Sequence, residues 1–276
     1  MTRQQLFRNP AYTAGCQASE DCGYHRGDDG GCSALHGALA HIVIEWQERQ
    51  ERHMDRGRRG FQQALRQIHD DVLMMGSAVD KAIERSLEAL KTLDSERARE
   101  IIRDDAEINR RRFDIEERVI ELMATQQPMA GDLRLLVSVL NIITDLERIG
   151  DHAEGNAKIV LLHANEPLLK SLVDLPKMAD KGRDMLRRSL TAFVERDAEA
   201  AKRIAAEDDE VDALYDRIYH DLLVIMTKDP TTIDRATWLL WAAHNFERIA
   251  DRVTNICERV VYEVSGRMQE MNVSTY

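Results

Sequence analysis

The sequence predicts an all-α protein built from two tandem, sequence-related three-helix bundles that follow a poorly ordered N-terminal extension. Three observations support this fold class. Apolar residues return every three or four positions over long stretches, and the second half of the chain repeats the first. Of the 276 residues, 43% are apolar, 32% are charged and only 5% are aromatic, with 5 prolines, which suits helical units better than a sandwich or barrel.

Residues 1–53 are expected to form the poorly ordered extension. Eight of the 14 glycines lie at or before Gly60, and residues 16–32 have neither apolar periodicity nor enough length to bury a core. The stretch 34–52 has the pattern of an isolated helix. A basic segment follows Met54, where the folded part would naturally begin, so we also considered a mis-assigned translation start for the extension.

The first bundle is expected over residues 54–166. Its first helix carries one apolar stripe at helical spacing from Phe61 to Leu93. Asp94 is placed to cap a second helix that runs to about Thr125, because an Asp side chain can accept hydrogen bonds from the first free N–H groups of a helix. The sequence QQP then breaks the pattern, and a third helix is expected over about 132–163.

The second bundle, residues 167–265, is predicted as a copy of the first, with residues 266–276 as a tail. Shifted by 103 positions, residues 79–109 align with residues 182–212 without a gap, and the cap Asp94 matches Asp197. The turns repeat as well, with KDP in place of QQP, and the offset becomes 100 after the second turn. Long helices with short connections must pack antiparallel to bury their apolar stripes.

The pattern Glu-Arg-Ile-x-Asp occurs once in each half. It places Glu147 and Asp151 on one helix face, and Glu247 and Asp251 on the equivalent face one hundred residues later. Each pair borders an apolar line of its helix. Like charges at this spacing destabilise an exposed helix by about 0.2 to 0.5 kcal/mol, and more where burial removes water, so a compensating partner is expected.

The preceding helix of each half contributes further acids. Asp208 and Asp212 are four residues apart, and their repeat mates are Asp105 and Asn109. In antiparallel neighbours the two pairs converge, and up to four carboxylates from two helices form an oxygen cage suited to divalent or trivalent cations. The expected metal ligands are Asp105, Glu147, Asp151, Asp208, Asp212, His244, Glu247 and Asp251.

The two halves are not expected to bind metal equally. Only the second half has four acids, and His244 precedes Glu247 by three residues and can add a nitrogen ligand. The first half has Thr144 and Asn109 at the equivalent positions, so we expect weaker binding there. The alternative that both groups are solvated or salt-bridged polar layers stays open. Other acidic pairs, such as Asp80 with Glu84, are interpreted as solvated surface.

Charge and cysteine usage exclude several function classes. The net charge of −11 argues against a nucleic-acid partner, because such affinity comes largely from Lys and Arg that release counterions. Three of the four cysteines lie in the first 32 residues, so no disulfide framework spans the chain, which fits a reducing cytoplasm. The longest uncharged stretch, residues 30–44, is too short for a membrane span.

Three motifs, together with the duplicated helical pattern, resemble the PhoU family of phosphate-uptake regulators. They are QQPMAGDLR at 126–134, LERIGDHAEG at 146–155 and FERIADR at 246–252. The resemblance covers about residues 55–265. Two departures affect the first half: Asn109 replaces the usual acid, and Gly155 stands where many family repeats have the Asn seen as Asn255.

The resemblance implies a cytoplasmic, non-enzymatic regulator that restrains phosphate uptake and phosphate-starvation signalling. The implied partners are the ATPase subunit of the phosphate ABC transporter, a phosphate-sensing histidine kinase and a second copy of the chain, with membrane association only through partners. The implied cofactors are carboxylate-bound iron or zinc clusters. Two alternatives are a metal-free helical adaptor and a carboxylate-bridged di-metal enzyme. The enzyme would need Glu-x-x-His pairs or an activated nucleophile, and only His244 qualifies.

Overall fold

The computed structural model describes residues 30–163, 169 and 173–271, with side chains from residue 58 onward, and this part of the chain is almost entirely helical. The helices are α1 (Gly30–Thr92), α2 (Ser95–Gln126), α3 (Gly131–His163), α4 (Asp174–Glu195), α5 (Ala198–Ala205), α6 (Asp208–Lys228) and α7 (Ile233–Ser265), with a 3-10 helix, η3 (Pro230–Thr232), before α7. The predicted all-α fold is confirmed.

The chain divides into two compact units, residues 1–57 and 58–276. The second unit contains α1 from residue 58 to its end and all later helices. The stretch 34–52, expected as an isolated helix, instead belongs to α1, which continues without a break to Thr92. Residues 1–29 lie outside the described residues, and the predicted domain boundaries stay predictions. In the described part of the chain, no helix is long and apolar enough to cross a membrane.

The predicted helix caps are present in both halves. The Asp94 carboxylate accepts hydrogen bonds from two backbone N–H groups in the first turn of α2, at 3.1 and 3.0 Å, and Asp197 accepts one from Ala200 at 2.9 Å. The residues before these caps, Leu93 and Arg196, are repeat mates and both adopt the left-handed region, with φ of 51° and 58°. The whole helix-to-helix turn is therefore duplicated, including its backbone strain.

The middle helix of the second half is broken, which the gapless sequence alignment did not predict. Helix α2 is continuous, whereas its counterpart stops at Ala205 and resumes at Asp208. Between them, Glu207 donates its N–H to the Ile204 carbonyl at 3.0 Å, and its carboxylate accepts two hydrogen bonds from Arg188 of α4. Acidic residues favour a helix N-terminus, so the run of four acids from Glu207 starts a new helix.

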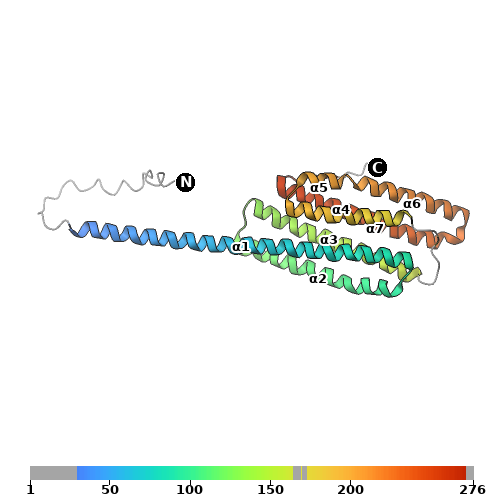
Figure 1. Ribbon diagram of the computed structural model, residues 1–276, viewed down its shortest axis with the longest axis horizontal. Helices are drawn as coiled ribbons and strands as arrows, with labels where there is room; N and C mark the ends of the chain where they lie inside the picture. Colours follow the sequence, from blue (N-terminus) through green and yellow to red (C-terminus); the bar gives the residue numbers. More distant parts are fainter. Residues whose placement is uncertain (1–29, 164–168, 170–172, 272–276) are drawn as a thin grey trace. The chain divides into compact units, whose positions relative to one another are not determined.

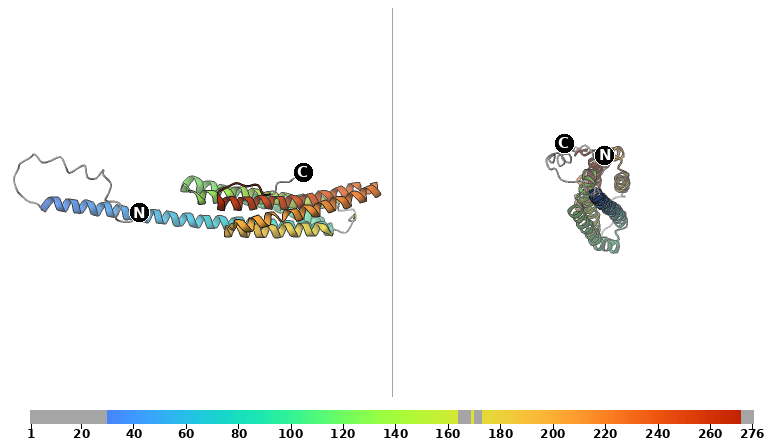
Figure 2. Two further views of the ribbon diagram at one scale, coloured as in Figure 1. Left: turned by 90° about the horizontal axis from the view of Figure 1, so that it is seen from above. Right: turned by 90° about the vertical axis from the view of Figure 1, so that its left-hand side faces the viewer.

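Helices of the two halves pack in antiparallel pairs. Figure 2 shows α3 beside α7 and α1 beside α4, while Figure 1 shows α2 on one side of this arrangement and α5 and α6 on the other. At the α1–α4 contact, a Cβ at Gly76 would lie only 2.2 Å from the Leu190 side chain, so the glycine permits this close approach. The core is one continuous apolar cluster across both halves.

Asp80 is not the solvated surface acid that its spacing indicated. Arg183 of α4 donates to both of its carboxylate oxygens, at 2.9 and 3.1 Å, and the two side chains are only 17% and 13% exposed. Asp80 and Arg183 occupy equivalent positions in the two halves, 103 residues apart. The ion pair therefore joins the same position of the repeat in α1 and α4.

Replacing this acid should destabilise the fold. We expect Asp80→Asn to lower the free energy of unfolding by about 1 to 3 kcal/mol, because it leaves a largely buried guanidinium with a weaker acceptor. The measurement is urea unfolding. The control is Asp104→Asn, which removes a 60% exposed partner of Arg85 and should change stability by less than about 1 kcal/mol. Equal small changes would contradict the assigned role of the Asp80 pair.

Candidate functional site

The first acidic group lies where α2 passes α3. A Cβ at Gly150 would come within 3.3 Å of an Asp105 carboxylate oxygen, so the glycine brings this acid close to α3. Burial, followed by the charges of Glu154, Asp151 and Glu147, raises the pKa of Asp105 to about 6. The predicted convergence of acids from two helices is therefore present in the first half.

Polar partners already surround this group. The Asn109 side chain donates to Asp105 at 2.7 Å. Asn109 stands where the family usually has an acid, so a hydrogen bond replaces the repulsion between two carboxylates. Arg148 donates to Asp151 at 3.2 Å and lies 3.4 Å from Glu147. The fourth acid, Glu154, was missed in the sequence analysis, although it follows Asp151 by three residues on the same helix face.

The second acidic group combines α6 and α7. Burial, followed by the charge of Asp251, raises the pKa of Glu247 to about 7, with smaller contributions from Asp212 and Asp208. Burial and Asp251 also raise the pKa of Asp212. Asp208, the first residue of α6, is only 1% exposed. The structure thus brings together the four acids that the repeat alignment predicted.

His244 reaches this group as expected. Its Nδ1 lies 3.2 Å from a Glu247 carboxylate oxygen, while Arg248 donates to Asp251 at 2.5 Å. Burial and the charge of Arg248 lower the pKa of His244, which favours the neutral imidazole that ligates metals. In each half the arginine inside the Glu-Arg-Ile-x-Asp motif therefore pairs with the aspartate of that motif.

The acids do not form a closed metal cage. Among the described residues, no three His, Cys, Asp or Glu side chains are arranged to hold a metal ion. The donor chemistry nevertheless fits a hard cation, because each group gathers carboxylates from two helices whose mutual repulsion a cation would relieve. Arg148 and Arg248 each occupy one carboxylate oxygen of Asp151 and Asp251. Metal ligation by the eight residues named from the sequence stays a prediction.

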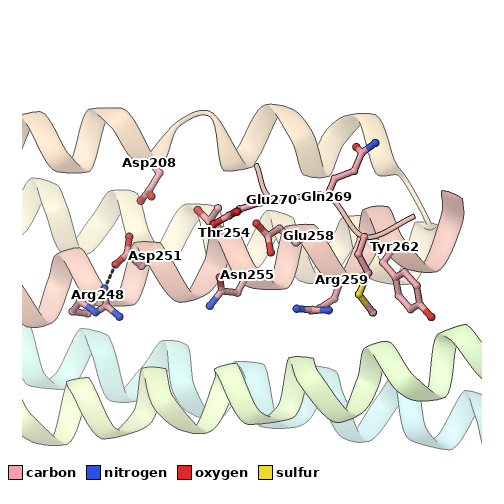
Figure 3. A pocket seen from close by; sticks show the side chains of 11 residues that line it. Asp208, Arg248, Asp251, Thr254, Asn255, Glu258, Arg259, Tyr262, Gln269 and Glu270 are labelled. Carbon is pink, nitrogen blue, oxygen red and sulfur yellow. Dashed lines mark hydrogen bonds and ion pairs between the residues drawn. The ribbon is translucent and has the colours of Figure 1, made fainter. Parts of the chain in front are cut away.

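A groove of about 410 Å³ adjoins the second acidic group. Figure 3 shows side chains along α7 on its floor, with Asp208 on the neighbouring helix and residues 269 and 270 of the tail above Thr254 and Glu258. Its lining is mostly polar and comprises Asp208, Arg248, Asp251, Thr254, Asn255, Glu258, Arg259, Tyr262, Met268, Gln269 and Glu270. A smaller cavity of about 230 Å³ adjoins Asp105 in the first half.

Beside the two acidic groups, α3 and α7 are joined by paired polar contacts that were missed in the sequence analysis. Asp145 accepts hydrogen bonds from Asn255 at 3.2 Å and from Arg252 at 3.4 Å. One hundred residues later, Asn245 donates to Asn156 at 3.0 Å and lies 3.3 Å from His152. Asp145 and Asn245 are repeat mates, as are Arg252 and His152, whereas Asn156 lies one position beyond the repeat mate of Asn255.

The second of these contacts explains the unusual Gly155. A Cβ at this position would lie 3.1 Å from the Asn245 side-chain nitrogen, closer than ordinary packing allows. Its repeat mate, Asn255, instead donates to Asp145. The two positions differ because they face different partners across the α3–α7 contact. The departure from the family pattern therefore serves the packing of the two halves.

Comparison with known proteins resolves the family. A family model described as the PhoU domain matches residues 72–160 and 175–260, and each match contains one of the acidic groups. The chain belongs to the PhoU family. A PhoU homolog from Clostridium acetobutylicum, named a phosphate-specific transport system accessory protein, is 38% identical over 216 residues, which cover 78% of this chain and 99% of the relative.

Further PhoU proteins agree with this assignment. The PhoU protein of Serratia marcescens is 36% identical over 210 residues, covering 75% of this chain and 85% of the relative. The crystal structure of PhoU from Pseudomonas aeruginosa has a TM-score of 0.72 at 32% identity and covers 75% of this chain and 100% of that chain. A crystal structure from Streptococcus pneumoniae, titled a phosphate transport system regulatory protein, has a TM-score of 0.71 at 32% identity, with coverage of 76% and 99%.

Proposed function

We propose that this protein is a non-enzymatic regulator of a phosphate transport system. The observation that carries the proposal is that the PhoU matches span both bundles and that the Clostridium acetobutylicum relative, an accessory protein of such a system, is covered over 99% of its length. The names of the relatives describe accessory and regulatory proteins. Burial raises the pKa of the Cys257 thiol to about 12, which disfavours a thiolate nucleophile in this fold.

The finer proposal is that it restrains phosphate uptake and starvation signalling by occupying partner surfaces in the cytoplasm. The partners would be the transporter's ATPase subunit and a sensor histidine kinase, and the protein would act as a homodimer. The long rigid helices support this proposal, because they offer extended surfaces that can be recognised without any chemical step.

Deleting the gene in its native host tests the proposal. Phosphate-starvation genes should then be expressed when phosphate is plentiful, and the excess phosphate uptake should disappear when the transporter is deleted as well. Reintroducing the intact gene is the control and should restore repression. Normal uptake and normal gene expression after deletion would overturn the regulatory role.

We further propose that the acidic groups hold metal, iron or zinc, with the second group binding more strongly. In that group, Asp208, Asp212, Glu247 and Asp251 would supply oxygen ligands and His244 a nitrogen. The bound cation would neutralise charges that otherwise repel. Glu247→Ala with Asp251→Ala should therefore remove more than about half of the bound metal, measured by elemental analysis with and without chelator.

The matched control for metal binding is Glu147→Ala with Asp151→Ala in the first half, which should remove less metal. Equal losses would refute the preference for the second group. No stoichiometric metal in the parent protein would favour the second candidate function, a metal-free helical adaptor. A specific observation supports that adaptor: Arg148 and Arg248 already form ion pairs with Asp151 and Asp251.

A further inference from the structure

The chain reverses direction at the end of α7. Gly266 has a φ of 72° and donates its N–H to the Tyr262 carbonyl at 2.8 Å, which ends the helix in the left-handed conformation that glycine adopts readily. The next residue, Arg267, donates its backbone N–H to the Ser265 hydroxyl at 3.1 Å. Residues 267–271 contain no helix and run back beside α7.

Two contacts hold this returning segment against α7. The backbone N–H of Met271 donates to a carboxylate oxygen of Glu258 at 2.9 Å, and the Met271 side chain packs against the apolar core. Between this anchor and Gly266, the side chains of Met268, Gln269 and Glu270 line the 410 Å³ groove. The segment is therefore tied at both ends and forms one wall of the groove.

The groove wall lies next to the second acidic group. Asp208 and Asp251 line the same groove as Glu270, and Figure 3 shows Gln269 and Glu270 above the part of α7 that carries Thr254 and Glu258. Thr254 is only 4% exposed. A cation or a partner side chain that approaches Asp251 along the groove from the Glu258 side would pass the tail segment.

We propose that residues 266–271 form a strap that restricts access to the second acidic group. Beyond the turn at residues 265–267, the contacts described for the strap are one backbone hydrogen bond and one methionine side chain. Segments with so few anchors open at a low free-energy cost. Its opening would widen the groove that Asp251 lines and would free the Glu258 carboxylate oxygen that accepts the Met271 N–H. If the strap also slows metal exchange at Asp251, that effect rests on the proposed function. The restricted access to the groove does not depend on it.

Thiol labelling of Thr254→Cys in the full chain tests the strap. A truncation that removes residues 267–276 should raise the rate of labelling by N-ethylmaleimide at position 254 at least about threefold, because the groove wall is lost. Gly266→Val in the intact chain should have the same direction of effect, because a β-branched residue disfavours the left-handed reversal. Mass spectrometry of the peptide that contains position 254 gives the rate.

Two controls make the labelling result specific. Cys257 lies in the same peptide and is fully buried, so its labelling reports unfolding and should not change. Glu154→Cys, the repeat mate of position 254, should label equally fast with and without the tail. An unchanged rate at position 254, or an equal rise at Cys257 or at position 154, would overturn the strap. Faster labelling in a protein that binds no metal would leave the strap standing and refute only the metal proposal.

Discussion

Phe193→Ala should lower the free energy of unfolding by about 3 to 5 kcal/mol. Phe193 is fully buried in α4, among the largest such side chains of the described core, and its ring meets His69 of α1 edge to face, with centroids 5.1 Å apart. The substitution removes apolar area from the core and leaves a cavity between helices of the two halves, which close-packed helices fill only in part. Urea unfolding followed by circular dichroism measures the loss.

The chain offers a matched control for Phe193. Phe113 in α2 is 55% exposed, and the guanidinium carbon of Arg112 lies 4.9 Å from its ring centroid. Phe113→Ala removes the same side chain without opening a buried cavity, so it should change stability by less than about 1 kcal/mol. Losses of equal size at the two positions would show that Phe193 does not join the halves through packing.

The repeat made most of the fold predictable from sequence. Each half contains the same apolar stripes, the same aspartate cap and the same turn, so each of the three helices expected per half was indicated twice. The acids Asp105 and Asp208 were found for the same reason, because each lies opposite a Glu-Arg-Ile-x-Asp motif in its own half. Short connections make neighbouring helices pack antiparallel, so the spacing of acids along each helix is enough to predict which acids meet.

Features that depend on contacts between the halves were not predictable in this way. In the sequence, Asp145 and Asn245 look like ordinary polar residues beside the apolar stripe of a helix. Only the contact between α3 and α7 shows that each forms a hydrogen bond to the other half. Asp80 looked like a surface acid because its partner, Arg183, lies 103 residues away. The break before Asp208 also has a tertiary cause, since residues of α4 draw the Glu207 carboxylate toward them. Hydrophobic periodicity in one sequence predicts helices, but it does not show which distant polar residues pair with each other.

Glu263 is another consequence of long-range packing. Its side chain is fully buried near the end of α7, where the Nε of Arg196 lies 3.1 Å from one carboxylate oxygen. Arg134 of α3 also faces this site and donates to the Glu263 backbone carbonyl at 3.2 Å. Burial raises the pKa of Glu263 to about 7, although the charges of Arg196 and Arg134 act in the opposite direction.

This pKa predicts that the contribution of Glu263 to the stability of the protein falls as the pH rises toward neutrality. The ordinary pKa of the group is near 4.5, so between about pH 4.5 and 7 the folded state binds a proton that the unfolded state has released. The contribution of Glu263 is therefore most favourable below pH 4.5 and declines as the pH rises through 7. The decline amounts to roughly 3 kcal/mol, because the pKa rises from 4.5 to about 7 and each pKa unit corresponds to about 1.4 kcal/mol.

Glu263→Gln should remove that decline, because the amide is neutral at every pH and resembles the protonated acid in shape. Relative to the parent, the variant should have nearly the same free energy of unfolding at pH 5 and should be about 1 to 3 kcal/mol more stable at pH 8. Urea unfolding at both pH values measures the difference. Glu195→Gln, at an exposed residue near the end of α4, is the control and should change the free energy of unfolding by less than about 1 kcal/mol at either pH. If Glu263→Gln destabilises the protein equally at pH 5 and pH 8, the ion pair with Arg196 dominates and the buried acid is charged throughout this range.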